Sequence, residues 1–243
     1  MYELMRSFRS GAREAFPLAY RLYCRLGLAK SLTLLKLAGV RQINYADRQM
    51  YVNRRDRHQR LRPDITNELD LPVEVRLWRE VTLRRPSICF DIGAHYGSFT
   101  LSGRYSPNTA CYSFEPNPYS SVCLLRSVHA HPDQSSIMVY QYAVSEHVGE
   151  VSLNVDTAKL ATSSLHSSPR FYGPVNEIQV QAITLDDFCA QNSLVPDGLV
   201  LIKTDTEGHD YRVLRGGLDF LSKAEELFGI AEFLPHLLEA AGT

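Results

Sequence analysis

The chain has 243 residues, enough for one α/β domain with a substantial core and an extension, but too few for two full domains. Its 44% hydrophobic and 22% charged residues are typical of a soluble globular protein. No run of about eighteen apolar residues occurs, and the start shows no signal-peptide pattern. These features exclude a membrane-spanning chain, and we do not expect secretion.

The net charge of −1 conceals an uneven distribution. Residues 1–60 contain 13 Lys+Arg and 4 Asp+Glu, whereas residues 61–243 contain 13 and 23. A basic segment of this kind can contact an anionic surface or cap an acidic domain. Because no basic cluster is longer than Arg54-Arg55, we do not expect nucleic acid as a partner.

The first element in chain order is a leucine- and tyrosine-rich stretch at residues 15–40, with Leu18, Leu22 and Leu26 at helical spacing. One interpretation is a peripheral membrane contact through this basic amphipathic segment. The other, which we favour, is a pair of helices that cap the main domain. Residues 47–64 lack an apolar period and predict a solvated connector. We therefore divide the chain into a basic helical N-terminal extension, 1–64, and a main domain, 65–243.

Residues 68–83 then predict a short helix, whose expected buried side chains are Val75, Leu77, Trp78 and Val81. After Pro86, residues 88–92 predict a buried strand that runs into a helix through a turn between Gly93 and Gly97. Glycine at such a turn permits positive φ and the close approach of a ligand. This strand, turn and helix predict a small-molecule site.

The later elements continue the alternation of strand and helix. Strands are predicted at 109–115, 137–144, 150–155, 177–182, 199–204 and 227–233, and helices at 119–129, 185–191 and 210–221, with a Ser/Thr-rich loop at 161–169. Repeated strand–helix units with near-continuous apolar strands indicate a parallel sheet covered on both faces. The predicted class is α/β, with a doubly wound, mostly parallel Rossmann-like sheet.

Carboxylates follow several of these strands: Asp91, Glu115, Asp205, Glu207 and Glu232. Ligands of open parallel sheets bind beyond the carboxyl ends of the strands. A single carboxylate there is commonly solvated or caps a helix, but several at one edge favour a ligand site.

Glu115 lies eighteen residues after Gly97, where an acidic side chain can accept hydrogen bonds from ribose hydroxyls. The preceding motif is DxGxxxG, which lacks the second glycine of the pyrophosphate-binding GxGxxG. The sequence has neither a GxxxxGK[ST] loop nor a YxxxK pair. These features favour a ribonucleoside cofactor without phosphates, and S-adenosylmethionine is the obvious candidate.

The same residues carry a resemblance to a known family. Five blocks, at 91–100, 114–118, 143–145, 183–188 and 202–217, have the order and spacing of FkbM-type methyltransferases. The chain resembles that family over about 86–233. The resemblance implies the fold of a class I S-adenosylmethionine-dependent methyltransferase, and methylation of hydroxyl oxygens on sugars or secondary-metabolite scaffolds.

The resemblance also implies the cofactor-binding residues. The motif residues Asp91, Gly93, Ala94, His95 and Gly97 would surround the methionine end of the cofactor, Glu115 would hold the ribose, Asn117 would border the adenosine, Ala143 and Val144 would line the adenine, and Asp205 would join them. His95 stands where the family usually has Asn, and we keep it as a cofactor contact. Asp205 and Glu207 match the family's acidic pair.

The resemblance further implies a final hairpin after the strand at 227–233. Residues 234–243 are too few to form it, so we expect this C-terminal hairpin to be missing. Either the chain is truncated, or the apolar edge is covered by the basic N-terminal region or by another subunit of a homo-oligomer.

Methylation of a hydroxyl is helped by a base that accepts its proton. The candidate catalytic residues are His209, Glu207 and Asp205, which share one side if the strand conformation continues, and His95 is a fourth candidate. Helix capping and turn formation are the alternative roles. We expect no metal. The loop from Thr162 to Tyr172 either forms part of the acceptor pocket or is a surface loop.

The predicted function is thus S-adenosylmethionine-dependent O-methyl transfer to a hydroxyl of a small molecule or glycan. The alternative is a catalytically inert binding or scaffold protein on the same fold. Within enzymes, the rival is a nicotinamide-dependent oxidoreductase. Five cysteines without metal-ligand spacing indicate reduced, mostly buried thiols and a cytoplasmic protein.

Overall fold

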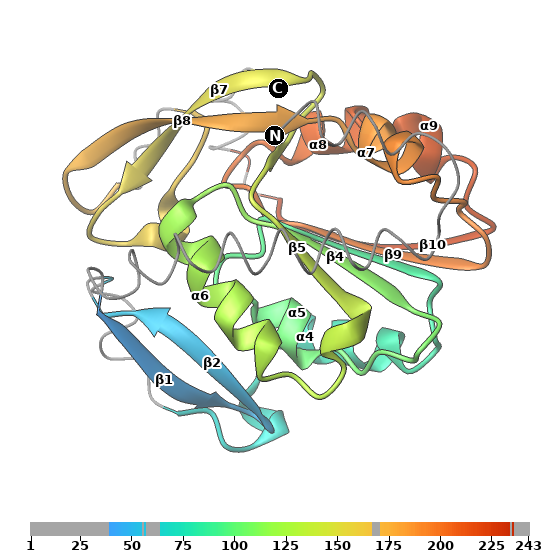
Figure 1. The fold of residues 1–243 in the computed structure, drawn as a ribbon, viewed down its shortest axis with the longest axis horizontal. Helices are drawn as coiled ribbons and strands as arrows, with labels where there is room; N and C mark the ends of the chain where they lie inside the picture. The colour runs from blue at the N-terminus through green and yellow to red at the C-terminus, as the bar shows by residue number, and fades with distance from the viewer. Residues whose placement is uncertain (1–38, 55, 57–63, 167–170, 234, 236–243) are drawn as a thin grey trace. The chain divides into compact units, whose positions relative to one another are not determined.

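A five-stranded parallel sheet forms the centre of the fold (Figure 1). The computed structural model describes residues 39–54, 56, 64–166, 171–233 and 235. The strand order is β10-β9-β3-β4-β5, where β3 is Ile88–Ile92, β4 is Ala110–Phe114, β5 is Ile137–Tyr140, β9 is Leu199–Thr204 and β10 is Glu226–Ala231. The chain builds outward from β3 to β5 and then returns to the other side of β3, so the order reverses between β3 and β9.

Helices cover both faces of this sheet, as Figure 1 shows. One face carries α4 (Val73–Thr82), α5 (Ser98–Ser102) and α6 (Pro118–His129), and the other carries α7 (Leu185–Gln191), α8 (Asp210–Arg215) and α9 (Leu218–Leu221). Single-turn 3-10 helices lie at Glu68–Asp70, Gln134–Ser136 and Leu160–Thr162. The predicted α/β class with a Rossmann-like sheet is confirmed.

A second, three-stranded sheet interrupts the alternation. Its order is β6-β8-β7, with β6 at Ala143–Val144, β7 at Gly149–Asp156 and β8 at Val175–Ile183. The strand predicted over 137–144 is therefore two strands, because the chain leaves the large sheet after Tyr140 and Ala143 pairs with Ala182 of β8. This small sheet carries the loop that contains the predicted Ser/Thr-rich segment.

A hairpin precedes the main sheet. It consists of β1 (Val40–Tyr45) and β2 (Arg48–Asn53), with Ile43 paired to Met50. The prediction of a solvated connector from residue 47 is wrong for β2, because Met50 and Val52 are buried. The amphipathic helices predicted before Gly39 lie outside the described residues, and the division at residue 64 stays a prediction.

Aromatic side chains fill the core between the sheet and α7. Phe188 of α7 packs edge-on against Phe114 and Tyr140, with ring centroids 4.9 and 5.0 Å apart. Aromatic pairs in this geometry add stability beyond the apolar area they bury. They hold the carboxyl ends of β4 and β5 in place.

The helix predicted over 68–83 is a single-turn 3-10 helix at Glu68–Asp70 followed by α4, in which Val75, Trp78 and Val81 are buried as expected. Leu77 was wrongly predicted to be buried, since it is 45% exposed. A buried arginine lies on this helix instead. The helix predicted over 210–221 is likewise two helices, because the chain turns at Gly216, where a Cβ would lie 2.0 Å from the carbonyl oxygen of Ser145.

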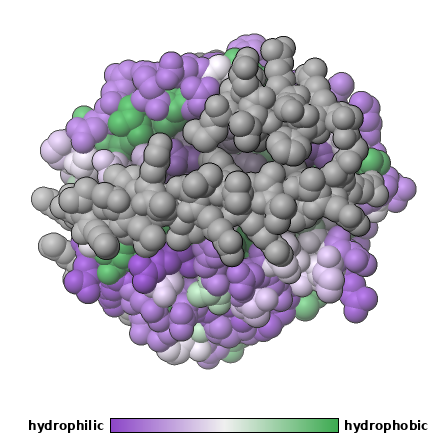
Figure 2. Space-filling model, in the orientation of Figure 1, coloured by the Kyte–Doolittle hydropathy of each residue, from purple (hydrophilic) through white to green (hydrophobic). Residues whose placement is uncertain are grey.

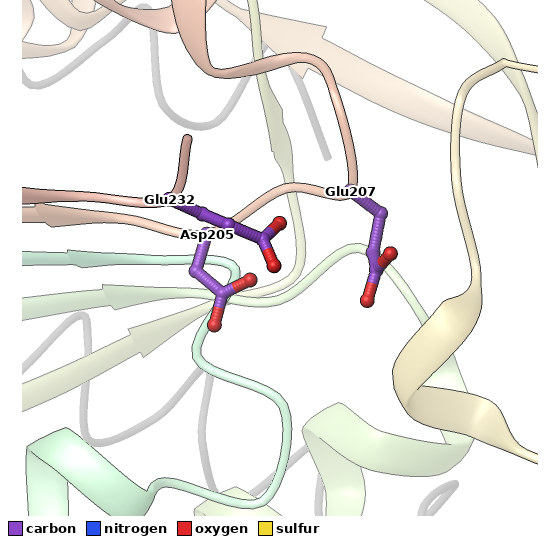
Figure 3. A group of neighbouring side chains, drawn as sticks. All are labelled: Asp205, Glu207 and Glu232. Carbon is purple, nitrogen blue, oxygen red and sulfur yellow. The ribbon is translucent and has the colours of Figure 1, made fainter. Parts of the chain in front are cut away.

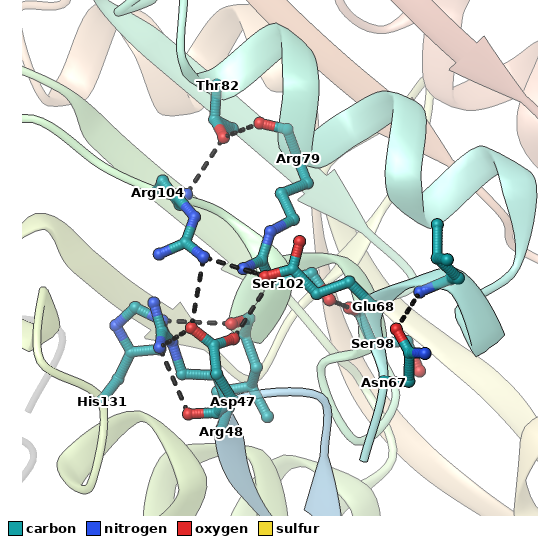
Figure 4. Close-up of polar contacts among 12 residues, drawn as sticks. Asp47, Arg48, Asn67, Glu68, Arg79, Thr82, Ser98, Ser102, Arg104 and His131 are labelled. Atoms are coloured by element: carbon teal, nitrogen blue, oxygen red, sulfur yellow. Dashed lines mark hydrogen bonds and ion pairs between the residues drawn. The ribbon is translucent and has the colours of Figure 1, made fainter. Parts of the chain in front are cut away.

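Arg79 links α4 to the first hairpin (Figure 4). Its guanidinium is paired with Asp47, at 3.1 Å, and with Glu68, while Arg104 binds the same two carboxylates at 3.3 and 3.1 Å. Arg79 is only 3% exposed. A charge buried in this way is costly once its partners are lost, so the network fixes the hairpin on the helix.

We expect Arg79→Met to lower the free energy of unfolding by about 2 kcal/mol, because Asp47 and Glu68 are partly exposed and keep some solvation. Urea denaturation would measure this. Arg84→Met is the matched control: Arg84 pairs with Glu226 on the surface, so its loss should cost less than about 1 kcal/mol. Equal effects of the two variants would contradict the network's role.

The cysteines and the surface of the described residues can also be compared with the sequence predictions. Cys89, Cys111, Cys123 and Cys189 are free and buried, as predicted, whereas Cys24 lies outside the described residues. Within the described part of the chain, no helix combines the length and apolar character needed to cross a bilayer. On the face shown in Figure 2, the described surface is mainly hydrophilic with small separate hydrophobic patches. Apart from Pro235, the segment after Phe233 is not described.

Candidate functional site

The order of strands in the large sheet reverses between β3 and β9. The carboxyl ends of these two strands lie at one edge of the sheet, called here the carboxyl edge. Ligands of open α/β sheets bind at such a switch point. A hollow of about 750 Å³, lined by Arg48, Arg85 and Arg104, lies elsewhere, beside loops that precede their strands. The predicted site residues are all at or near the carboxyl edge, so the candidate site is there.

The turn after β3 is shaped by contacts within the protein. Gly93 has φ +72°, and a Cβ there would lie 2.0 Å from the carbonyl oxygen of Asp205. Gly97 has φ +93°, and a Cβ there would lie 2.5 Å from Leu124 Cδ1. Both positions have the expected positive φ, and glycine is also required there for close packing within the protein. The expected close approach of a ligand is not tested by these contacts.

His95 has a left-handed backbone, with φ 51°, which is uncommon for a residue other than glycine. In this conformation its N–H donates to Glu115 Oε2 at 2.7 Å. Its ring lies 3.8 Å, centroid to centroid, from Tyr96, and its Nε2 is 3.9 Å from Asp56 Oδ2. The buried Asp56, which also accepts from the Tyr96 hydroxyl at 3.1 Å, was missed by the sequence analysis.

Glu115 lies at the end of β4 with its carboxylate enclosed. Oε1 accepts from Asn117 N–H at 2.8 Å, and Oε2 accepts from His95 N–H. Burial raises the pKa of Glu115 to about 7, although the two N–H donors and Lys203 oppose this rise. Each carboxylate oxygen can accept a further hydrogen bond, as contact with two vicinal hydroxyls would require.

A buried ion pair between Lys203 and Asp91 contacts the backbone of the turn after β3. Lys203 Nζ lies 3.2 Å from Asp91 Oδ1 and donates to the carbonyl oxygens of Ile92, at 3.1 Å, and Gly93, at 2.8 Å. Although burial opposes it, the Asp91 charge keeps the pKa of Lys203 above its ordinary value. Lys203 was not among the predicted site residues, although a lone lysine stands near the end of the apolar run LVLIKT.

Asp91 is fully buried, and its other oxygen accepts from the N–H and hydroxyl of Thr100, at 3.0 and 2.6 Å. The structure therefore places Asp91 beneath the turn as an organising residue. Its predicted contact with a cofactor stays a prediction. Ala94 is also buried, and its N–H donates to the carbonyl oxygen of Phe114 at 2.9 Å.

Asn117, Ala143 and Val144 follow the neighbouring strands. Asn117 caps α6 by accepting from Tyr119 N–H, and its Nδ2 donates to Ser163 Oγ at 3.3 Å. Ala143 and Val144 form β6 and are each 3% exposed. Their predicted role beside an adenosine is not tested by these contacts.

Three carboxylates gather at the edge, on Asp205, Glu207 and Glu232 (Figure 3). An oxygen of each lies within 4.8 Å of the others. Asp205 and Glu232 follow the paired strands β9 and β10, and Glu207 comes from the loop before α8. Exposed acidic groups often lie together without a metal, so this cluster by itself does not indicate a metal site.

Asp205 and Glu207 lie close together, but His209 does not join them, because the extended conformation on which the predicted common side depended ends at Thr204. Glu207 has φ 53° and Gly208 φ 95°, so the chain reverses before α8. His209 is 5% exposed, and its ring contacts Ser145 and His166 and is not part of the carboxylate cluster. Its predicted role as a base is not tested by these contacts.

The charge of this edge restricts the ligands it can accept. In the three residues after each of β3, β4, β9 and β10, the acidic or basic side chains other than His95 are all carboxylates: Glu115, Asp205, Glu207 and Glu232. Such a set suits a ligand with positive charge and hydroxyl donors, and disfavours a pyrophosphate. S-adenosylmethionine has a sulfonium, an ammonium group and ribose hydroxyls, so its positive charges and hydrogen-bond donors fit this set of carboxylate acceptors.

The sheet and its edge are those of the Rossmann-like methyltransferase class. A comparison with known protein families matches residues 91–234 to the methyltransferase FkbM domain. This match covers more than half of the chain, which therefore belongs to the FkbM methyltransferase family. The domain implies methyl transfer from S-adenosylmethionine. Searches of the curated proteins and of the solved structures found no match.

Proposed function

We propose that this protein binds S-adenosylmethionine at the carboxyl edge and transfers its methyl group to a hydroxyl oxygen of a small molecule or sugar. The observation that carries the proposal is Glu115, which is enclosed at the end of β4 next to the turn after β3. The acidic character of the edge supports a cationic cofactor over a dinucleotide.

In this proposal, Glu115 accepts hydrogen bonds from the ribose hydroxyls. The turn at Gly93 to His95 holds the methionine end, because Lys203 and Glu115 fix its backbone. Asp205, whose side chain is 45% exposed, attracts the positive charge. When bound, S-adenosylmethionine supplies an electrophilic methyl group. The protein's main contribution is to orient the acceptor oxygen and exclude water.

Calorimetry with S-adenosylmethionine tests the cofactor. We expect binding, competition by S-adenosylhomocysteine, and no competition by NADH. Absence of S-adenosylmethionine binding would overturn the proposal and favour an inert scaffold, whereas NADH competition would favour an oxidoreductase.

Transfer of a labelled methyl group from S-adenosylmethionine into the small-molecule fraction of a cell extract tests the reaction. We expect a product whose labelled methyl is bound to oxygen, as mass spectrometry and NMR of the isolated product would show. Label on nitrogen or carbon would contradict O-methylation and leave methyl transfer intact.

A further inference from the structure

Three side chains form a continuous line of hydrogen bonds beside the site. Ser145 Oγ lies 2.9 Å from His209 Nε2, and His209 Nδ1 lies 2.9 Å from His166 Nε2. The three residues come from separate segments, after β6, before α8 and in the loop between β7 and β8. Both ring nitrogens of the buried His209 are thus engaged within the protein, and the line ends at the half-buried His166.

The loop that carries His166 is fastened to residues of the candidate site. Ser163 Oγ accepts from Asn117 Nδ2 at 3.3 Å, and Ser164 Oγ donates to the carbonyl oxygen of Glu207 at 2.9 Å. The N–H of His166 in turn donates to Ser164 Oγ at 3.1 Å. The loop therefore spans the edge from the end of β4 to the segment after β9, and brings His166 to the site.

Both histidines are neutral near pH 7. Burial, then His166 and Arg212, lower the pKa of His209 to about 3. Burial and Arg212 also lower the pKa of His166. Arg212 of α8 is itself paired with Glu146 at 3.1 Å, and the backbone of Glu207 faces the loop.

Two directions of donation satisfy a neutral pair. In one, Ser145 donates to His209 and His209 donates to His166, which leaves the remaining proton of His166 on Nδ1. In the other, His166 Nε2–H donates to His209, and His209 Nε2–H donates to Ser145. Only the second direction leaves a lone pair on His166 Nδ1, the arrangement that a general base requires.

We propose that His166 is the general base for methyl transfer, acting through Nδ1, and that His209 and Ser145 are positioning residues that fix its tautomer. This inference rests on the proposed function. The acceptor O–H bond breaks, its proton passes to Nδ1, and the oxygen electron pair forms the new bond to the methyl carbon. The methyl–sulfur bond breaks with its electrons going to sulfur, and the imidazolium later releases the proton to water.

NMR of the ¹⁵N-histidine-labelled protein tests the tautomer without an acceptor. We expect His166 to carry its proton on Nε2, with a scalar coupling across the hydrogen bond to His209 Nδ1. His166→Gln and His209→Gln assign the signals, and His209→Gln should also shift His166 toward a mixture of tautomers. A proton on His166 Nδ1, or an absent coupling, would overturn the proposal.

Labelled methyl transfer into the small-molecule fraction of a cell extract provides the kinetic test. We expect His166→Gln to lower the rate on the order of 10²-fold or more. The exposed His147, substituted in the same way, should leave the rate unchanged. A His166→Gln rate within twofold of the wild type would overturn the role of His166.

Calorimetry on the same samples separates the two levels of inference. We expect His166→Gln to bind S-adenosylmethionine within about twofold of the wild type, since a base for the acceptor contributes little to cofactor affinity. If the wild type does not bind the cofactor, the proposed function fails. If both bind it and label at the same rate, only the role of His166 fails.

Discussion

Lys203→Met is expected to lower the free energy of unfolding by about 3–5 kcal/mol, which urea denaturation would measure. Lys203 is 2% exposed, and its ammonium neutralises Asp91, which is fully buried. Methionine would leave that carboxylate charged in the interior and would remove the donor that holds the carbonyl oxygens of Ile92 and Gly93. The loss is large relative to the total stability of a typical domain.

The charge itself should account for most of this effect. In the double variant Asp91→Asn/Lys203→Met, the buried charge is gone and the amide oxygen still accepts from Thr100. We therefore expect the double variant to be more stable than Lys203→Met alone. Lys223→Met is the surface control, because Lys223 is 67% exposed and pairs with Asp219 at 3.9 Å. A double variant no more stable than Lys203→Met would contradict the account.

The sequence predicts best those elements whose signals are local. Residues 185–191 and 199–204 form α7 and β9 with the expected bounds. Thr184 caps α7 by accepting from Asp187 N–H, and β9 is an apolar run between turns. The residues that form a helix cap, or an apolar run, are close together in the sequence. Such elements can therefore be predicted from the sequence alone.

Elements that depend on distant contacts were predicted less well. The helix over 210–221 breaks at Gly216 because this glycine packs on the backbone of Ser145. The hairpin strand β2 was missed because its polar residues contact other elements: Arg48 donates to His131, and Tyr51 N–H donates to Ser127. His131 and Ser127 are distant in the sequence from β2, so the local pattern of apolar residues does not predict these contacts.

The candidate site shows the same division. Glu115 could be located from its spacing to the glycine motif, and the structure places it beside the turn after β3. His166 could not, since its partner His209 lies 43 residues away and no motif marks it. The direction of His209 was predicted wrongly because a left-handed Glu207 reverses the chain.

Glu115 should make stability depend on pH between about 4.5 and 7. Its folded pKa, about 7, lies above its ordinary value of 4.5 because the group is buried. Over this range the unfolded state loses the proton while the folded state keeps it, so the contribution present at low pH is lost as pH rises. The loss approaches about 3 kcal/mol above pH 7.

Glu115→Gln removes this titration. We therefore expect the stability of the wild type relative to Glu115→Gln to fall between pH 5 and pH 8, as urea denaturation at each pH would show. Asp219→Asn removes one negative charge at a site 85% exposed and should leave the pH dependence close to that of the wild type. A constant difference between the wild type and Glu115→Gln across this range would contradict the raised pKa.

Cofactor binding should depend on the same proton with the opposite sign. Ribose hydroxyls donate to an ionised carboxylate, so the proposed binding favours the deprotonated form of Glu115. Below pH 7, calorimetry should show the dissociation constant of S-adenosylmethionine rising by up to about tenfold per pH unit. Glu115→Gln should bind more weakly and with little change over this range. If the wild type binds equally well at pH 6 and pH 8, Glu115 does not hold the ribose through its carboxylate.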